Sequence, residues 1–131
     1  GDGTQTRSFI YVSDLVAGLE HVIKDADIDG EVFNVGNPRE ITMLQLAERI
    51  LEATGSSSTI EFTSGRVGDP ERRRPIIDKI RDRYGWEPAV GLSDGIGHTI
   101  EDFKAAEVRA RAQTNGVERP QVGISVGIAA A

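Results

Sequence analysis

Segments with the composition of β-strands alternate with helical segments along most of this chain, and that alternation limits the possible folds more than any other feature. Three short runs rich in β-branched and aromatic residues are predicted as strands: residues 8–12, 31–35 and 59–63. Four segments with helical spacing of apolar residues or with helix boundary signals are predicted as helices: 14–24, 43–54, 76–84 and 93–112. Such an order predicts an α/β fold in which some strands pair in parallel.

The second predicted helix has the clearest boundaries. Thr42 is followed three residues later by Gln45, which makes a capping box, and Gly55 ends the helix. For the first helix, Ser13 and Asp14 supply N-cap chemistry. Its buried stripe is predicted to consist of Leu15, Leu19, Val22 and Ile23. The inward side chains of the last helix are predicted to be Ile96, Ile100 and Phe103.

Composition excludes several classes of protein. The 131 residues suffice for one ordinary domain, and 15 Lys and Arg against 21 Asp and Glu give a net charge of −6. An acidic balance disfavours nucleic acid or an anionic membrane as partner. No run approaches the roughly 18 apolar residues of a membrane-spanning helix. The absence of cysteine excludes disulfides, iron–sulfur clusters and thiolate zinc sites, and fits a cytoplasmic location, which we expect.

Three familiar patterns fail on inspection. Residues 25–30 (DADIDG) match half of an EF-hand loop, but the twelfth position is Gly36 instead of Glu, so a solvated acidic turn is predicted. Residues 123–127 (GISVG) are spelled like a nucleophile elbow, but neither Asp nor His follows. His21 and His98 lie far apart in the sequence and are predicted at the surface. We therefore predict no metal site. The chain also contains no G-x-G-x-x-G motif and no P-loop, so it has no recognisable phosphate-binding loop for a dinucleotide or a nucleoside triphosphate.

Two polar loops share a chemistry suited to phosphate. One contains Gln5 and Arg7; the other contains Arg66, Asp69 and the basic run 72–74. Residues 64–85 hold seven basic and four acidic residues, a local charge of +3. If the loops meet, arginines could bind a pyrophosphate and Asp69 a ribose hydroxyl, as a nucleoside diphosphate requires. An isolated basic run is more often a solvated loop face, and spacing alone does not decide between the two.

Four strings carry a resemblance to a known family: residues 1–15 (GDGTQTRSFIYVSDL), 33–38 (FNVGNP) with 41–43 (ITM), 68–75 (GDPERRRP) and 84–88 (YGWEP). They resemble the C-terminal part of the extended short-chain dehydrogenases/reductases, the NAD-dependent epimerase/dehydratase family. Within it the likeness is greatest to UDP-glucuronate decarboxylases, followed by dTDP-glucose 4,6-dehydratases and UDP-sugar 4-epimerases. It covers residues 1–104, and we find no counterpart for residues 105–131.

The resemblance implies roles for particular residues. Arg7 matches a residue that binds the nucleotide diphosphate, and Gln5 lies in the same loop. Arg66 and Asp69 match the epimerases' pyrophosphate-binding arginine and ribose-binding aspartate, and Arg73 matches an arginine of the decarboxylases' nucleotide site. Four further matched positions are interpreted structurally: Tyr11 as strand packing, Asp14 as a helix cap, Asn34 and Gly36 as the end of a strand.

The resemblance also implies an enzyme in two parts. The N-terminal part is a Rossmann fold with an NAD loop and a Tyr-x-x-x-Lys pair, and the C-terminal part holds the nucleotide sugar. Tyr11 is followed four residues later by Leu15, and Tyr84 by Pro88, so this chain lacks that pair and should contain no catalytic residue. Residues 1–104 are therefore expected to be the substrate-binding C-terminal part, lacking most of the Rossmann domain, and 105–131 a helix extension with a flexible tail.

These expectations lead to two functional hypotheses. In the first, the chain binds a UDP-sugar, with UDP-glucuronate the foremost candidate, and is inert alone because NAD belongs to the parent enzyme. The alternative parent is a dTDP-glucose 4,6-dehydratase or a UDP-sugar 4-epimerase. In the second, the chain is a non-catalytic interaction module that pairs with a Rossmann partner, or with itself as a homo-oligomer, through exposed apolar surface.

Overall fold

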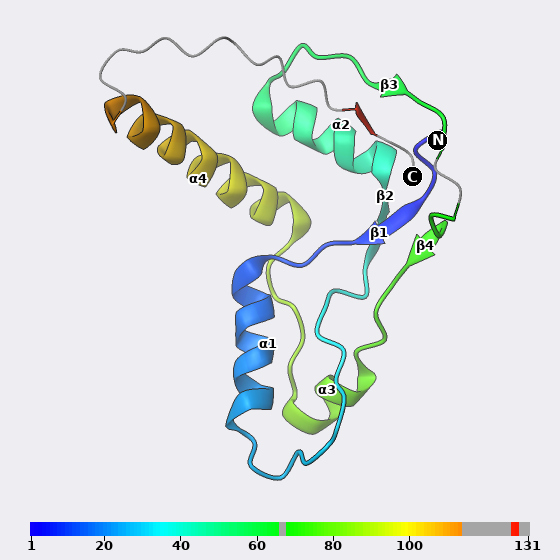
Figure 1. Ribbon diagram of the computed structural model, residues 1–131, viewed down its shortest axis with the longest axis vertical. Coiled ribbons are helices and arrows are strands. Elements are labelled where there is room, and N and C mark those ends of the chain that lie inside the picture. Colours follow the sequence, from blue (N-terminus) through cyan, green and yellow to red (C-terminus); the bar gives the residue numbers. More distant parts are fainter. Residues whose placement is uncertain (66–67, 114–126, 129–131) are drawn as a thin grey trace.

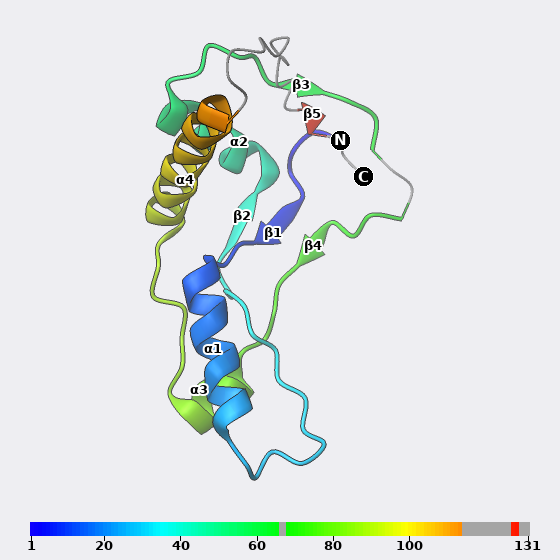
Figure 2. The same ribbon diagram turned by 60° about the vertical axis from the view of Figure 1, so that its left-hand side comes forward.

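A small sheet lies between two groups of helices (Figure 1). The computed structural model describes residues 1–65, 68–113 and 127–128. In the view of Figure 1, α2 and α4 lie above the central sheet and α1 and α3 lie below it, and the same arrangement is visible after rotation (Figure 2). The helices are α1 (Val12–Lys24), α2 (Met43–Thr54), α3 (Asp78–Tyr84) and α4 (Leu92–Gln113). The strands are β1 (Thr6–Ser8), β2 (Glu40–Thr42), β3 (Glu61–Phe62), β4 (Arg72–Arg73) and β5 (Gly127–Ile128).

The central sheet is mixed, with strand order β2-β1-β4. Strand β1 runs antiparallel to β2, with Arg7 opposite Ile41, and parallel to β4, with Arg7 opposite Arg73. A second, two-stranded sheet joins β3 to β5 in parallel. The predicted α/β class with parallel pairing is therefore present, although the strands that form the central sheet are not those predicted.

Of the three predicted strands, 59–63 contains β3, 8–12 overlaps β1 only at Ser8, and 31–35 is wrong. Residues 31–35 belong to no sheet and are held through side chains instead: Phe33 and Val35 pack on the core, and the Asn34 side-chain amide donates to the carbonyl of Ile76 at 3.1 Å. Strands β2 and β4 have three and two residues, too few to show an alternating pattern. The structural role assigned to Gly36 fits its surroundings, since a Cβ there would lie 2.8 Å from Cγ of Pro75.

The core lies between α1 and α3. It is formed by Ile77, Ile80 and Trp86, and Ile80 is fully buried. Helix α1 approaches this core through Gly18, where a Cβ would lie 2.6 Å from Cγ1 of Val35 and 2.9 Å from Cε2 of Trp86. Trp86 is buried just beyond the end of α3, and Gly85 ends that helix with φ of 65°.

Helix α2 begins and ends as its sequence predicts. The Thr42 hydroxyl accepts from the amide of Gln45, and the Gln45 side chain accepts from the amide of Thr42, both at 3.1 Å. Gly55 ends the helix in the left-handed region with φ of 63°. Both signals are local, so no tertiary contact was needed to foresee them.

The N-terminus of α1 differs from its prediction. The helix begins two residues earlier than predicted, at Val12, with Tyr11 at the N-cap position and no side-chain cap. Asp14 is therefore not a cap: it lies in the first turn, is buried, and its Oδ2 accepts from the amide of Val90 at 2.8 Å. Tyr11 packs as predicted but outside any strand, with its ring 5.4 Å from that of His98. Asp14 thus ties α1 to the segment that leads into α4.

We expect Asp14→Ala to lower the free energy of unfolding by about 1 kcal/mol, because the Val90 amide loses a charge-assisted hydrogen bond. Urea denaturation followed by circular dichroism measures this change. The exposed neighbour Ser13 is the control, since Ser13→Ala removes the other side chain that the sequence offers as a cap. A loss for Ser13→Ala equal to that for Asp14→Ala would contradict the structural assignment.

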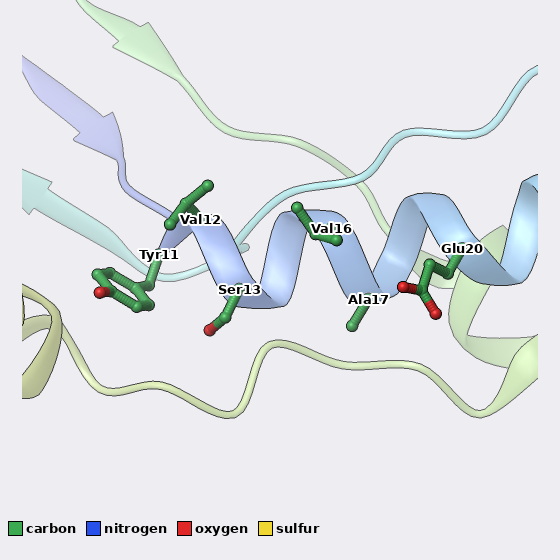
Figure 3. A pocket seen from close by; sticks show the side chains of 6 residues that line it. All are labelled: Tyr11, Val12, Ser13, Val16, Ala17 and Glu20. Atoms are coloured by element: carbon green, nitrogen blue, oxygen red, sulfur yellow. The ribbon is translucent and has the colours of Figure 1, made fainter.

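Helix α1 also leaves an apolar surface uncovered. Only Leu15 and Val22 of the predicted stripe are partly buried, while Leu19 and Ile23 are exposed, because the helix turns Asp14 and Gly18 toward the core. Val12, Val16, Leu19 and Ile23 form what we call the α1 apolar face; Ile23 is 78% exposed. Beside it lies a shallow depression (Figure 3), lined by Tyr11, Val12, Ser13, Val16, Ala17 and Glu20.

Helix α4 packs only near its beginning. Ile96 and Ile100 are partly buried, as predicted, and α4 contacts α2. Phe103 is 71% exposed and was wrongly predicted to face inward; it lies in the stretch 101–111, where every side chain is exposed. Among the described residues, no helix is both long and apolar enough to cross a membrane. Of residues 114–131, the structure describes only β5.

Candidate functional site

The two polar loops that the sequence singled out meet at the β1–β4 pair. Parallel pairing sets Arg7 opposite Arg73, and the amide of Thr6 donates to the carbonyl of Glu71 at 2.9 Å. The loop that precedes β4 carries Asp69 to the same place. The condition on which the phosphate hypothesis rested, that the two loops lie together, is therefore fulfilled.

Asp69 lies between two guanidinium groups. Its Oδ2 accepts from Nη2 of Arg7 at 2.7 Å, while its Oδ1 is 3.8 Å from Nη2 of Arg73. The side chains of Arg7 and Asp69 are only 17% and 12% exposed, whereas that of Arg73 is 65% exposed. We call Arg7, Asp69 and Arg73 the Arg7 cluster. It is a half-buried ion pair with a second, accessible cation beside it.

Arg7 is held from two directions. Its Nη2 binds Asp69, and its Nη1 donates to the carbonyl of Thr6 at 2.8 Å. A guanidinium fixed in this way presents its donors in one orientation, so less side-chain entropy is lost when an anion binds. The charge of the cluster is +1, from two arginines and one aspartate, and its exposed part is cationic.

The other two predicted site residues are not placed in this cluster. Gln5 lies immediately before β1, and its carbonyl accepts from the amide of Met43 at 3.0 Å, which ties it to the start of α2. Arg66 lies outside the described residues, so its predicted contact with pyrophosphate stays a prediction.

Sequence reasoning missed a second set of charges on the opposite face of the sheet. Glu40 of β2 accepts from the Thr6 hydroxyl at 2.7 Å and from Nε of Arg72 at 2.7 and 2.8 Å, and it also binds Nη2 of Arg72. These hydrogen bonds, first from Arg72 and then from Thr6, hold the pKa of Glu40 at about 2, well below its usual 4.5. In the sequence, only the opposite charges of Glu40 and the 72–74 run could have indicated this ion pair. Glu40 and Arg72 lie 32 residues apart, so the charges alone did not suggest it.

The depressed pKa of Glu40 gives a pH-dependent stability. The carboxylate of Glu40 is favoured in the folded chain, so its contribution is complete above the unfolded pKa near 4.5 and is lost as pH falls toward 2. We expect the urea midpoint of the wild-type chain to exceed that of Glu40→Gln at pH 7, and the difference to shrink between pH 4.5 and 2. A difference that does not change with pH would show that the ionised form of Glu40 is not what stabilises the fold.

The titratable groups that the structure describes do not gather into a set of metal ligands. No group of three or more potential ligands occurs among the described residues. In the acidic turn at 25–30, Asp25 accepts from Nε of Arg83 and from the Tyr84 hydroxyl, both at 2.8 Å. His21 and His98 are exposed, as predicted, and lie against Tyr84 and Tyr11.

Comparison with known proteins gives one consistent set of similarities. A family model described as "NAD dependent epimerase/dehydratase family" matches residues 1–36. The chain is 45% identical over 104 residues to UDP-glucuronic acid decarboxylase 1 of Arabidopsis thaliana, covering 79% of this chain and 23% of that protein. It is 41% identical over 121 residues to UDP-glucuronic acid decarboxylase 1 of Danio rerio, covering 92% of this chain and 28% of that protein. The second alignment reaches into residues 105–131, where we had found no counterpart.

Solved structures agree with the sequence comparison. UDP-glucuronic acid 4-epimerase from Bacillus cereus, in complex with UDP-glucuronic acid and NAD, matches with TM-score 0.74 and 31% identity over 81% of this chain and 34% of its own. UDP-glucose 4-epimerase from Thermotoga maritima, with UDP-glucose, matches with TM-score 0.75 and 33% identity over 82% of this chain and 34% of its own. The chain thus spans about a quarter of the length of its curated relatives and about a third of these solved chains.

Proposed function

Because this chain belongs to the NAD-dependent epimerase/dehydratase family, we propose that it is the part of a UDP-glucuronate decarboxylase-like enzyme that binds the nucleotide of a UDP-sugar. In this proposal it corresponds to the C-terminal, substrate-binding part of the fold. The similarity to decarboxylases at 45% and 41% identity favours UDP-glucuronate as the sugar nucleotide. The solved epimerases that resemble it carry UDP-glucuronic acid or UDP-glucose.

The Arg7 cluster is the observation that carries this proposal. A diphosphate requires fixed cationic donors, and Arg7 and Arg73 supply two guanidinium forks on adjacent parallel strands. Asp69 Oδ1 lies beyond hydrogen-bond distance of Arg73, so it can accept from a ribose hydroxyl. A site built from paired strands is more precise than one built on loops alone.

The described residues do not fit the NAD that family members bind. A dinucleotide needs a glycine-rich turn that opens a helix, where backbone amides face the pyrophosphate. Residues 9–11, 40–42 and 75–77, which precede α1, α2 and α3, contain no glycine, and α4 is preceded by the single Gly91. NAD is therefore assigned to a part of the enzyme outside these residues.

Neither tyrosine suits the role of a catalytic base. Partial desolvation, followed by the hydrogen bond to Asp25, raises the pKa of Tyr84, whereas a tyrosine base requires a lowered pKa. Tyr11 lies against Gly95 and His98 at the junction of α1 and α4. In this proposal the chain binds and orients the nucleotide and takes no part in oxidation, decarboxylation or hydride return.

Calorimetric titration of the chain with UDP tests the proposal. We expect UDP and UDP-glucuronate to bind with similar affinity, because the Arg7 cluster would contact the diphosphate that both share, and uridine to bind much more weakly. Circular dichroism before and after the titration establishes that the chain is folded. Absence of heat from UDP at millimolar concentration, with a folded chain, would refute a self-sufficient nucleotide site.

The α1 apolar face favours a second candidate function, that of an interaction module. Single exposed apolar residues are common on protein surfaces, but four on one side of a helix form a contiguous patch, which is typical of an interaction site. We propose a Rossmann partner, or a second copy of this chain, as the protein that covers them. Light scattering of the wild type and of Val16→Glu tests the second copy: a dimer that becomes a monomer on substitution supports it, and a monomeric wild type contradicts it.

A further inference from the structure

The two faces of the central sheet carry two different sets of charges. Alternation along β1 directs Arg7 to one face and Thr6 and Ser8 to the other. The register extends this division across the sheet, since Arg73 pairs with Arg7 while Arg72 pairs with Thr6. Glu40 pairs with Ser8 and therefore lies on the Thr6 face. Glu40 and Arg72 thus lie behind the sheet when the Arg7 cluster is viewed from the front.

Strand β4 is attached to β1 by few contacts of its own. Only two residue pairs form the parallel ladder, with the Thr6–Glu71 backbone bond beside it. The Ser8 hydroxyl adds a contact of 3.3 Å to the carbonyl of Arg73. A ladder this short is weak by itself, yet the distance between Arg7 and Arg73 depends on it.

Glu40 spans all three strands of the sheet. Glu40 lies in β2. Its carboxylate accepts a hydrogen bond from the Thr6 hydroxyl of β1 and binds the guanidinium of Arg72 in β4 through both oxygens. Its side chain is 14% exposed. Exposed ion pairs contribute little, but a two-pronged arginine–carboxylate pair within a network is the geometry in which they do contribute.

We propose that Glu40 is a positioning residue for the nucleotide site: by holding β4 against β1 from behind, it keeps Asp69 and Arg73 beside Arg7. This inference rests on the proposed function, because it assigns Glu40 a role in the same diphosphate site. Without Glu40, Arg72 is released and β4 is free to separate from β1. The two arginines then no longer converge on one anion, although neither has been altered.

A purely electrostatic effect of Glu40 and a positioning role predict opposite changes in affinity for an anion. Glu40→Gln removes one negative charge near a cationic site, and this change alone should strengthen the binding of an anion. A positioning role demands weaker binding instead. The sign of the change in affinity therefore separates the two explanations.

The experiment is a calorimetric titration of Glu40→Gln with UDP, beside the wild type and Glu52→Gln. Glu52 is an exposed residue on α2, so its substitution changes the net charge equally and leaves the sheet intact. We expect Glu40→Gln to raise the dissociation constant about tenfold and Glu52→Gln to leave it nearly unchanged. A dissociation constant for Glu40→Gln that is equal to or below the wild-type value overturns the proposal.

A second measurement keeps this test separate from that of the proposed function. Amide exchange followed by NMR reports on the Thr6 amide, which donates to the carbonyl of Glu71 immediately before β4, and on the Met43 amide, which donates to the carbonyl of Gln5 immediately before β1. We expect Glu40→Gln to accelerate exchange at Thr6 but not at Met43. Equal protection of Thr6 in both proteins overturns the positioning role. If the wild type binds no UDP, the proposed function fails by itself, and the Thr6 amide still decides whether Glu40 holds β4.

Discussion

Replacing Arg7 with glutamine should weaken the binding of UDP to the chain by a factor of about 10 to 100. Arg7 is the most buried cation of the cluster, and a charge-assisted hydrogen bond to phosphate contributes about 1.5–3 kcal/mol. The substitution also leaves the carboxylate of Asp69, only 12% exposed, without its 2.7 Å partner. An uncompensated carboxylate next to a diphosphate repels it, so both effects act in the same direction.

Two variants control this experiment. Arg49→Gln removes the same charge from an exposed position on α2, and it should leave the affinity for UDP nearly unchanged. The double variant Arg7→Gln/Asp69→Asn removes the unpaired carboxylate and should recover stability in urea without recovering the affinity. If Arg7→Gln and Arg49→Gln weaken UDP binding equally, the effect is one of overall charge and the Arg7 cluster is not the site.

Replacing Gly18 with alanine should lower the free energy of unfolding by about 2 kcal/mol. The added methyl group would lie 2.6 Å from Cγ1 of Val35 and 2.9 Å from Cε2 of Trp86, which is closer than carbon atoms can approach. Helix α1 must then move away from the core, and the contacts of Trp86 with Ile77 and Ile80 loosen. Urea denaturation, followed by the fluorescence of the single tryptophan, measures the change.

A second glycine provides a control with the opposite sign. Gly97 lies within α4, and a Cβ there would meet no atom within 4 Å. Gly97→Ala should stabilise the chain by about 0.5–1 kcal/mol, because alanine loses less backbone entropy than glycine in a helix. Stabilisation by both substitutions would contradict the close approach of α1 to Trp86.

Local signals in the sequence predicted local structure well. The capping box of Thr42 and Gln45 and the helix-ending Gly55 are each defined by residues within one turn, and each is found in the structure. The prediction for Asp14 failed because its partner, the amide of Val90, lies 76 residues away. Cap chemistry and a buried tertiary hydrogen bond use the same side chain, and the sequence around Asp14 does not distinguish them.

The strands were harder to predict for a related reason. β2 and β4 owe their pairing to β1 and are too short to show a pattern of their own, while residues 31–35 have the composition of a strand but are held by side chains. In the site, the proximity of Arg7 and Asp69 was anticipated through the resemblance to a family. Glu40 was not, because its contacts cross from β2 to β4 and nothing near it in the sequence marks them.

The position of the Arg7 cluster also determines when during folding it can form. Arg7 and Asp69 are 62 residues apart, and β1 and β4 close a loop that contains α1, β2, α2 and β3. Closing so long a loop is entropically unfavourable until the intervening helices have packed, and contacts of this range form slowly. If the Arg7 cluster binds a diphosphate as proposed, this capacity should therefore appear last in a refolding experiment, after helical circular dichroism has recovered, and a peptide that ends before β4 should lack it.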